Sequence, residues 1–233
     1  VVFSSGGIIL REVAYTYDLF DRKIARSVDA DGAGPATPEI THTVYDGEHA
    51  WVDFDAAGLV SARYLFGDST DEIIARWRPI EGTAWYLTDH LGTVRDIANA
   101  AGALINHYEY DSFGNILSQT NSAAGDRFTY TGREWDPELE MYYYRARFYD
   151  AVAGRFISQD PLGFTAGDPN LYRYVGNAPL THTDPSGNLA LTECAFVKAV
   201  DAAISVGCAI ADEWATGNLT SDDPADKAEM AFS

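Results

Sequence analysis

One short motif recurs along the chain: alternating aromatic or apolar residues lead into an aspartate, and a glycine-bearing turn follows. The copies lie at residues 15–18 (YTYD), 43–46 (TVYD), 85–89 (WYLTD) and 108–111 (YEYD). Successive side chains of a strand point to opposite faces, so Tyr108 and Tyr110 are predicted on one face. Aspartate bonds the backbone of its own turn and glycine accepts a positive φ. Asp111 and Gly114 therefore predict a tight turn, with a returning strand from residue 115.

The spacing of the motif indicates stacked hairpins. Residues 89–97 (DHLGTVRDI) follow the same plan, with Gly92 in the turn and Val94 at the start of the returning strand. Asp89 and Asp111 lie 22 residues apart, about one hairpin and its connection. A repeat of this period is typical of stacked units rather than of a compact α/β domain. The alternative is an ordinary tyrosine-rich antiparallel sheet, and both interpretations make the chain mainly β up to residue 187.

The excess of acidic over basic residues argues against nucleic acid and anionic membranes as partners. The chain has 233 residues, with 16 lysines and arginines against 35 aspartates and glutamates, and a formal net charge of −19. Nucleic acid and anionic membranes both require clustered cations, so neither is predicted as a partner. Hydrophobic residues make up 46% of the chain, which is enough for a sizeable core. Much of the acidity is assigned to the turn aspartates Asp18, Asp46, Asp89 and Asp111.

The composition changes toward the C-terminus. Alanine, valine and isoleucine replace the tyrosine and glycine pattern, and residues 195–214 predict a helix, followed by a short second helix at 225–232. Charged residues interrupt the apolar run 189–210, so no membrane span is predicted. On one unbroken helix Cys194 and Cys208 would lie about 21 Å apart along the axis. That is too far for a disulfide, which needs Cα atoms within about 7 Å.

Four consecutive stretches carry a resemblance to a known family. They are residues 88–97 (TDHLGTVRDI), 108–117 (YEYDSFGNIL), 128–160 (FTYTGREWDPELEMYYYRARFYDAVAGRFISQD) and 160–187, which opens with DPLG, contains NLYRYVGNAP and closes with DPSG. In their order and spacing they resemble the Rhs/YD-repeat family, and specifically its C-terminal Rhs repeat-associated core. Residues 1–85 resemble the same repeats more loosely. The remaining residues, 188–233, lie outside this resemblance.

The resemblance implies an architecture and a setting. It divides the chain into degenerate YD repeats at 1–85, the Rhs repeat-associated core at 86–187 and a variable, helical C-terminal segment at 188–233. The antiparallel sheet would spiral as part of a hollow shell, as in bacterial insecticidal toxin complexes and polymorphic toxins, and enclose that segment. The implied partners are the rest of the shell, the enclosed effector segment, and a secretion machinery or toxin-complex partner. The implied location is secreted or on the bacterial cell surface, and a chain that opens at Val1 without an initiator methionine favours a piece of a longer protein.

In many members of this family the core is also an aspartyl autoprotease. Peptide hydrolysis by carboxylates needs two of them close enough to share a proton, one to activate water and one to protonate the carbonyl oxygen or the leaving amine. Asp160 and Asp184 are the natural pair, because each opens a D-P-x-G turn whose proline and glycine stiffen the backbone. The family cuts just beyond the second of these turns. A tethered substrate has a high effective concentration, so weak catalytic groups suffice.

Arginines that precede the pair are candidates to support it. Arg145, Arg147 and Arg155 lie upstream, and the resemblance selects Arg147 and Arg155. A guanidinium keeps a neighbouring carboxylate ionised and orients it by two parallel hydrogen bonds. The alternative is structural: each aspartate caps a turn, and the arginines pair with neighbouring strands.

The junction departs from the family pattern. A large apolar residue usually follows the second D-P-x-G and precedes the cut, whereas here Asn188 takes that place and Leu189 comes next. Either the cut has moved to follow Leu189, or this copy does not cleave.

Two other functions remain open. Aromatic strands stack on sugars, so the chain could be a non-catalytic adhesion or carbohydrate-contact module, and residues 188–233 could be a small toxin or a helix that fills the shell. No cofactor is implied. The histidines, His42, His49, His90, His107 and His182, lack metal-ligand spacing, and residues 29–37 (DADGAGPAT) lack the remaining calcium ligands and predict a solvated loop.

Overall fold

The computed structural model describes residues 1–188 and contains two antiparallel sheets. The predicted helices at 195–214 and 225–232 and both cysteines lie outside the described residues. The large sheet contains β1 (Val2–Ser5), β2 (Ile8–Tyr17), β3 (Lys23–Asp29), β4 (Glu39–Asp46), β5 (His49–Phe54), β6 (Val60–Phe66), β7 (Ile73–Arg78), β8 (Gly82–Thr88), β9 (Val94–Asn99), β10 (Leu104–Tyr110) and β11 (Ile116–Gln119). The small sheet contains β12 (Glu134–Asp136), β13 (Met141–Tyr144), β14 (Arg147–Asp150) and β15 (Arg155–Phe156).

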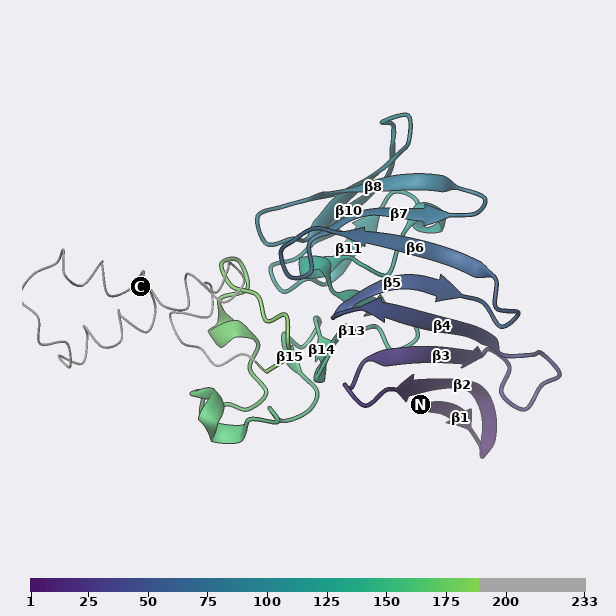
Figure 1. Ribbon diagram of the computed structural model, residues 1–233. Helices are drawn as coiled ribbons and strands as arrows, with labels where there is room; N and C mark the ends of the chain where they lie inside the picture. Colours follow the sequence, from purple (N-terminus) through teal and green to yellow (C-terminus); the bar gives the residue numbers. More distant parts are fainter. Residues whose placement is uncertain (189–233) are drawn as a thin grey trace, which may run out of the picture. The chain divides into compact units, whose positions relative to one another are not determined.

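Every strand of the large sheet pairs with its neighbours in the sequence, so eleven strands form one continuous meander (Figure 1). The prediction of a mainly β chain built from stacked hairpins is confirmed. Strand β8 spans the expected junction between residues 85 and 86, and the sheet continues across it without a break. Four short 3₁₀ helices complete this part of the chain: η1 (Ser122–Ala124), η2 (Tyr130–Gly132), η3 (Gly163–Ala166) and η4 (Val175–Asn177).

A single type of turn joins many of these strands. One side-chain oxygen of its first residue accepts hydrogen bonds from the backbone N–H groups two and four residues later, at 2.8–3.1 Å. The residues that begin these turns are Asp18, Asp55, Asp89, Asn99 and Asp111. A side chain that satisfies two backbone donors stabilises the turn without help from the rest of the fold.

The sequence pattern identified some of these turns and missed others. Asp55 and Asn99 lack the preceding tyrosine pair, and the signal they share with Asp89 and Asp111 is a glycine three residues later. At Asp18 that position is Asp21, which also has a positive φ. Asp46 differs from its predicted relatives, because it pairs with His49 across a two-residue hairpin turn. Gly114 (φ +86°) explains the need for glycine, since a Cβ there would lie 2.4 Å from the Tyr130 ring.

The small sheet packs against the turn between β10 and β11 of the large sheet through a cluster of buried tyrosines. Tyr142, Tyr144, Tyr149 and Tyr174 are fully buried beside Phe156. Their hydroxyls find partners, as buried hydroxyls must. Those of Tyr142 and Tyr149 donate, each at 2.8 Å, to the carbonyls of Gly114 and Phe113, and that of Tyr144 bonds that of Tyr174 at 3.1 Å. The small sheet therefore contacts a repeat turn directly.

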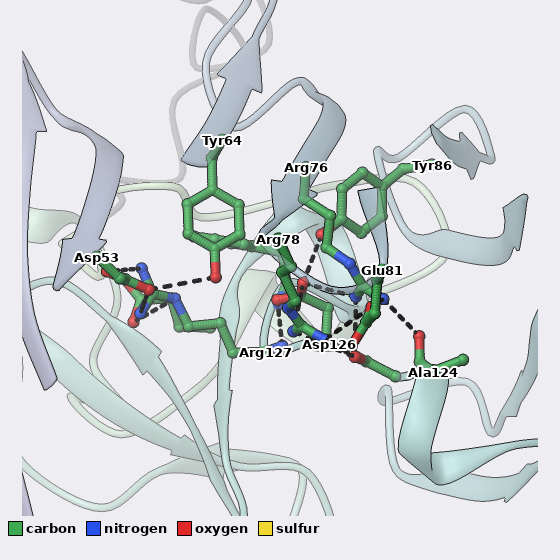
Figure 2. Close-up of polar contacts among 12 residues, drawn as sticks. Asp53, Tyr64, Arg76, Arg78, Glu81, Tyr86, Ala124, Asp126 and Arg127 are labelled. Carbon is green, nitrogen blue, oxygen red and sulfur yellow. Dashed lines mark hydrogen bonds and ion pairs between the residues drawn. The ribbon is translucent and has the colours of Figure 1, made fainter. Parts of the chain in front are cut away.

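Buried ion pairs attach the segment after β11 to the face of the large sheet that carries Tyr64 and Tyr86, here called the inner face. Asp126 is bonded by Arg76 at 2.7 Å, by Arg78 at 3.1 Å and by the Tyr86 hydroxyl at 2.7 Å (Figure 2). Burial disfavours the ionised form of Asp126, but the two arginines hold its pKa below the ordinary value. Arg127, the next residue, pairs with Asp53 of β5 at 2.9 Å. These contacts set the path of the chain into the small sheet.

Candidate functional site

The two D-P-x-G turns are versions of the repeat turn. Asp160 Oδ1 accepts the Leu162 N–H at 2.8 Å, and the Gly163 N–H donates to the Asp160 carbonyl at 2.9 Å. Asp184 Oδ1 accepts the Asn188 N–H, four residues on, at 3.2 Å. Proline removes one backbone donor at the second position of each turn. In both turns Oδ1 bonds the backbone of the turn, and Oδ2 faces another side chain.

That side chain is Arg147, at the start of β14. Its Nη2 lies 3.0 Å from Oδ2 of Asp160 and 3.5 Å from Oδ2 of Asp184. All three residues are buried: Arg147 is 4% exposed, Asp160 7% and Asp184 1%. The structure therefore brings Asp160, Asp184 and Arg147 to one point, although 23 residues separate the two aspartates in sequence.

Backbone carbonyls and an aromatic ring hold the Arg147 side chain in place. Its Nη1 donates to the Leu171 carbonyl at 3.0 Å, its Nε donates to the Gly187 carbonyl, and its guanidinium lies 3.6 Å from the Phe156 ring centroid. Burial lowers the pKa of Arg147, and the two carboxylates oppose that shift. One buried cation thus faces two buried carboxylates.

The other predicted arginine lies elsewhere. Arg155 begins β15, its side chain is exposed, and within residues 1–188 it forms no ion pair with Asp160 or Asp184. Arg145, which the family comparison did not select, lies closer to the second turn.

The backbone of the second turn is bonded by three consecutive residues of the β13–β14 hairpin. The pairs are the Arg145 side chain with the Pro185 carbonyl, the Ala146 N–H with the Ser186 carbonyl at 3.3 Å, and the Arg147 side chain with the Gly187 carbonyl. Gly187 (φ +69°) packs so closely that a Cβ would lie 2.2 Å from the Tyr144 carbonyl oxygen. The junction is thus seated on the hairpin that carries Arg147.

A cavity of about 450 Å³ adjoins this junction. Aromatic residues such as Phe66 and Tyr143 form its walls, Arg145 and Asp71 form a charged side, and Ser186 and Asn188 lie at its margin. Within residues 1–188, no cluster of His, Cys, Asp and Glu could hold a metal ion. Over the same residues, no helix is long and apolar enough to cross a membrane.

A continuous antiparallel meander with aspartate-capped turns, followed by a small sheet and then by two D-P-x-G turns, defines a YD-type repeat shell protein. A model of the Teneurin YD-shell family matches residues 9–180, and the chain belongs to that family. The resemblance to Rhs/YD-repeat proteins of the toxin type is therefore confirmed.

The relatives include toxins. Toxin protein Tse5 of Pseudomonas aeruginosa is 30% identical over 203 residues, which cover 76% of this chain and 15% of Tse5. The tRNA nuclease WapA of Bacillus subtilis is 29% identical over 181 residues, which cover 75% of this chain and 7% of WapA. The TcdB2-TccC3-TEV crystal structure has the same fold, with a TM-score of 0.63 at 20% identity, over 80% of this chain and 9% of that one. The chain thus spans a small part of each relative.

Proposed function

We propose that this chain is the C-terminal core of a larger YD shell and that it closes one end of that shell around its own C-terminal segment. The much greater length of the relatives supports this proposal. So does β1, which within residues 1–188 pairs only with β2, and where Val2 is 52% exposed and Phe3 37%. Exposed backbone donors and acceptors on an edge strand favour pairing with a further strand. The partners proposed are therefore the preceding repeats, the enclosed segment, and a toxin-complex or secretion partner outside the cell.

We further propose that the core cuts its own chain near Asn188 and Leu189. The observation that carries this proposal is the convergence of Asp160 and Asp184 on the single buried Arg147. One carboxylate takes a proton from water as the water attacks the carbonyl carbon. The other donates a proton to the leaving amine as the C–N bond breaks. Arg147 contacts one oxygen of each carboxylate and holds both in place.

Intact mass of the purified chain tests the proposal. Two species that divide at 188/189 or 189/190 are expected. Asp160→Asn removes the acid but keeps the turn, because Asn99 forms the same turn elsewhere in the sheet. We expect this variant to remain full length. Asp111→Asn, the matched change in a repeat turn, is expected to cleave as the wild type does. Complete cleavage of the Asp160→Asn chain would exclude the assignment.

A second candidate, carbohydrate contact, is favoured by aromatic side chains on the outer face of the large sheet. Trp51 is 55% exposed, Trp77 39% and Trp85 45%, and Trp85 pairs with Ala75 across β7 and β8. Flat, exposed aromatic rings stack on sugars. Glycan-array binding that is lost in Trp77→Ala and Trp85→Ala would support this function, and an inert array would count against it.

A further inference from the structure

Asp71, in the loop between β6 and β7, bonds Arg145 with both carboxylate oxygens. Oδ1 lies 2.7 Å from Arg145 Nη2, and Oδ2 lies 3.2 Å from Arg145 Nη1. The same Nη1 donates to the Pro185 carbonyl of the second D-P-x-G turn. A two-point contact fixes the plane of a guanidinium, which a single contact does not. Asp71 therefore determines how Arg145 reaches the turn that carries Asp184.

Asp71 is itself held firmly. It is 5% exposed, and Oδ1 also bonds Arg133 Nη1 at 2.7 Å. Arg133 in turn donates to the Tyr143 carbonyl at 2.9 and 3.2 Å, so the acid is tied to β13 as well. Its φ of +60° is uncommon for a residue other than glycine. Gly132 packs directly against the Asp71 carbonyl oxygen, because a Cβ on Gly132 would lie only 2.2 Å from that atom. The surrounding contacts hold the backbone in this unfavourable conformation. Such strained residues cluster at functional sites.

We propose that Asp71 is a positioning residue for self-cleavage: through Arg145 it fixes the turn at 184–187 and thus the placement of Asp184 against Arg147. This inference rests on the proposed autoprotease function. Asp71 belongs to the repeat region at 1–85, whereas Asp160 and Asp184 belong to the core. The site is then complete only when the repeats have packed against the core, so that cleavage follows assembly.

The test uses the full chain and four variants. Asp71→Asn removes the charge that orients Arg145, and Arg145→Lys keeps the charge but loses the two-point contact. The double variant measures whether the two residues act together. Asp68→Asn is the matched control, because Asp68 lies exposed in the same loop. Cleavage rates are measured by intact mass against time, well below each variant's thermal midpoint, so that only folded chain is compared.

We expect Asp71→Asn to slow cleavage by roughly tenfold to a hundredfold, since a misplacement of about 1 Å can cost a hundredfold in rate. Arg145→Lys should slow it similarly, and the double variant should be no slower than the slower single variant. A role limited to stability would lower the thermal midpoint and leave the rate for folded chain unchanged. Equal rates in Asp71→Asn, Asp68→Asn and the wild type would overturn the proposal.

A second measurement separates this proposal from the proposed function. Amide hydrogen exchange of residues 184–188 reports the order of the turn whether or not the chain is cut, and it is compared in the Asp160→Asn background. Faster exchange in chains that also carry Asp71→Asn, but not in those with Asp68→Asn, supports the positioning role. Equal exchange overturns it. A wild-type chain that never cleaves would refute the proposed autoprotease function. The exchange rates of the turn would then decide by themselves whether Asp71 positions it.

Discussion

The repeat turns and the two D-P-x-G turns use aspartate in the same way and differ in what surrounds it. At Asp111 one oxygen caps the turn, and the residue is exposed. At Asp160 and Asp184 one oxygen does the same, but the other is buried against Arg147. Asp18 lies between these cases, because its second oxygen bonds Arg22 near the surface. The same turn aspartate is thus a candidate reactive group only where its second oxygen is buried against a cation.

The first test of this difference between the turns is to remove the arginine that contacts each aspartate. Arg147→Met removes the cation from two buried carboxylates and is expected to cost about 3–5 kcal/mol of unfolding free energy at neutral pH. It should also abolish cleavage. Arg22→Met, at the half-exposed Asp18 pair, should cost much less, since solvent screens that pair. Urea unfolding of both variants gives the two losses. Similar losses would mean that burial does not distinguish the turns.

Acid titration tests an acid that lies outside the turns, Glu134 of β12, which is buried beside Lys23 and Arg127. Lys23 and Arg127 lower the pKa of Glu134 to about 2, against the opposing effect of burial. Because the folded-state pKa is depressed, the stabilisation is complete above about pH 4.5 and is lost as the pH falls toward 2. A shift of this size corresponds to roughly 3 kcal/mol. Glu134→Gln should therefore unfold more easily at pH 7 and show a shallower loss of stability between pH 4.5 and 2, measured by denaturant titration at each pH.

The glycines of the two kinds of turn offer a third test. Gly187 and Gly102 both have a positive φ, which costs alanine about 1–2 kcal/mol. A Cβ at Gly102 would contact nothing within 4 Å, whereas one at Gly187 would strike the Tyr144 carbonyl. Gly187→Ala should therefore be less stable than Gly102→Ala by a further 2 kcal/mol or so. Thermal unfolding measures both, and equal midpoints would show that the second turn is not seated on the hairpin.

The sequence allowed prediction of those features that depend on local chemistry. Turn residues and strand alternation act within a few residues, so the hairpins around Asp89 and Asp111 could be predicted. Asp160 and Asp184 could be named because each opens a recognisable turn. By contrast, nothing near Asp71 in the sequence indicates that it contacts Arg145, since the two lie 74 positions apart. The burial of Arg147 also depends on long-range packing, because residues 160–187 fold back onto it.

The smallest expected effect concerns Arg155, which resemblance to the family placed beside Arg147. Its side chain is exposed on β15, and a charge in water interacts weakly with a buried acid. Arg155→Gln should therefore leave the cleavage rate within about twofold of the wild type, and the unfolding free energy within about 0.5 kcal/mol. Intact mass against time and urea unfolding measure the two quantities. A tenfold loss of rate would mean that Arg155 reaches the acids in the reacting state. Contact with the second turn would then not separate the arginines that support cleavage from those that do not.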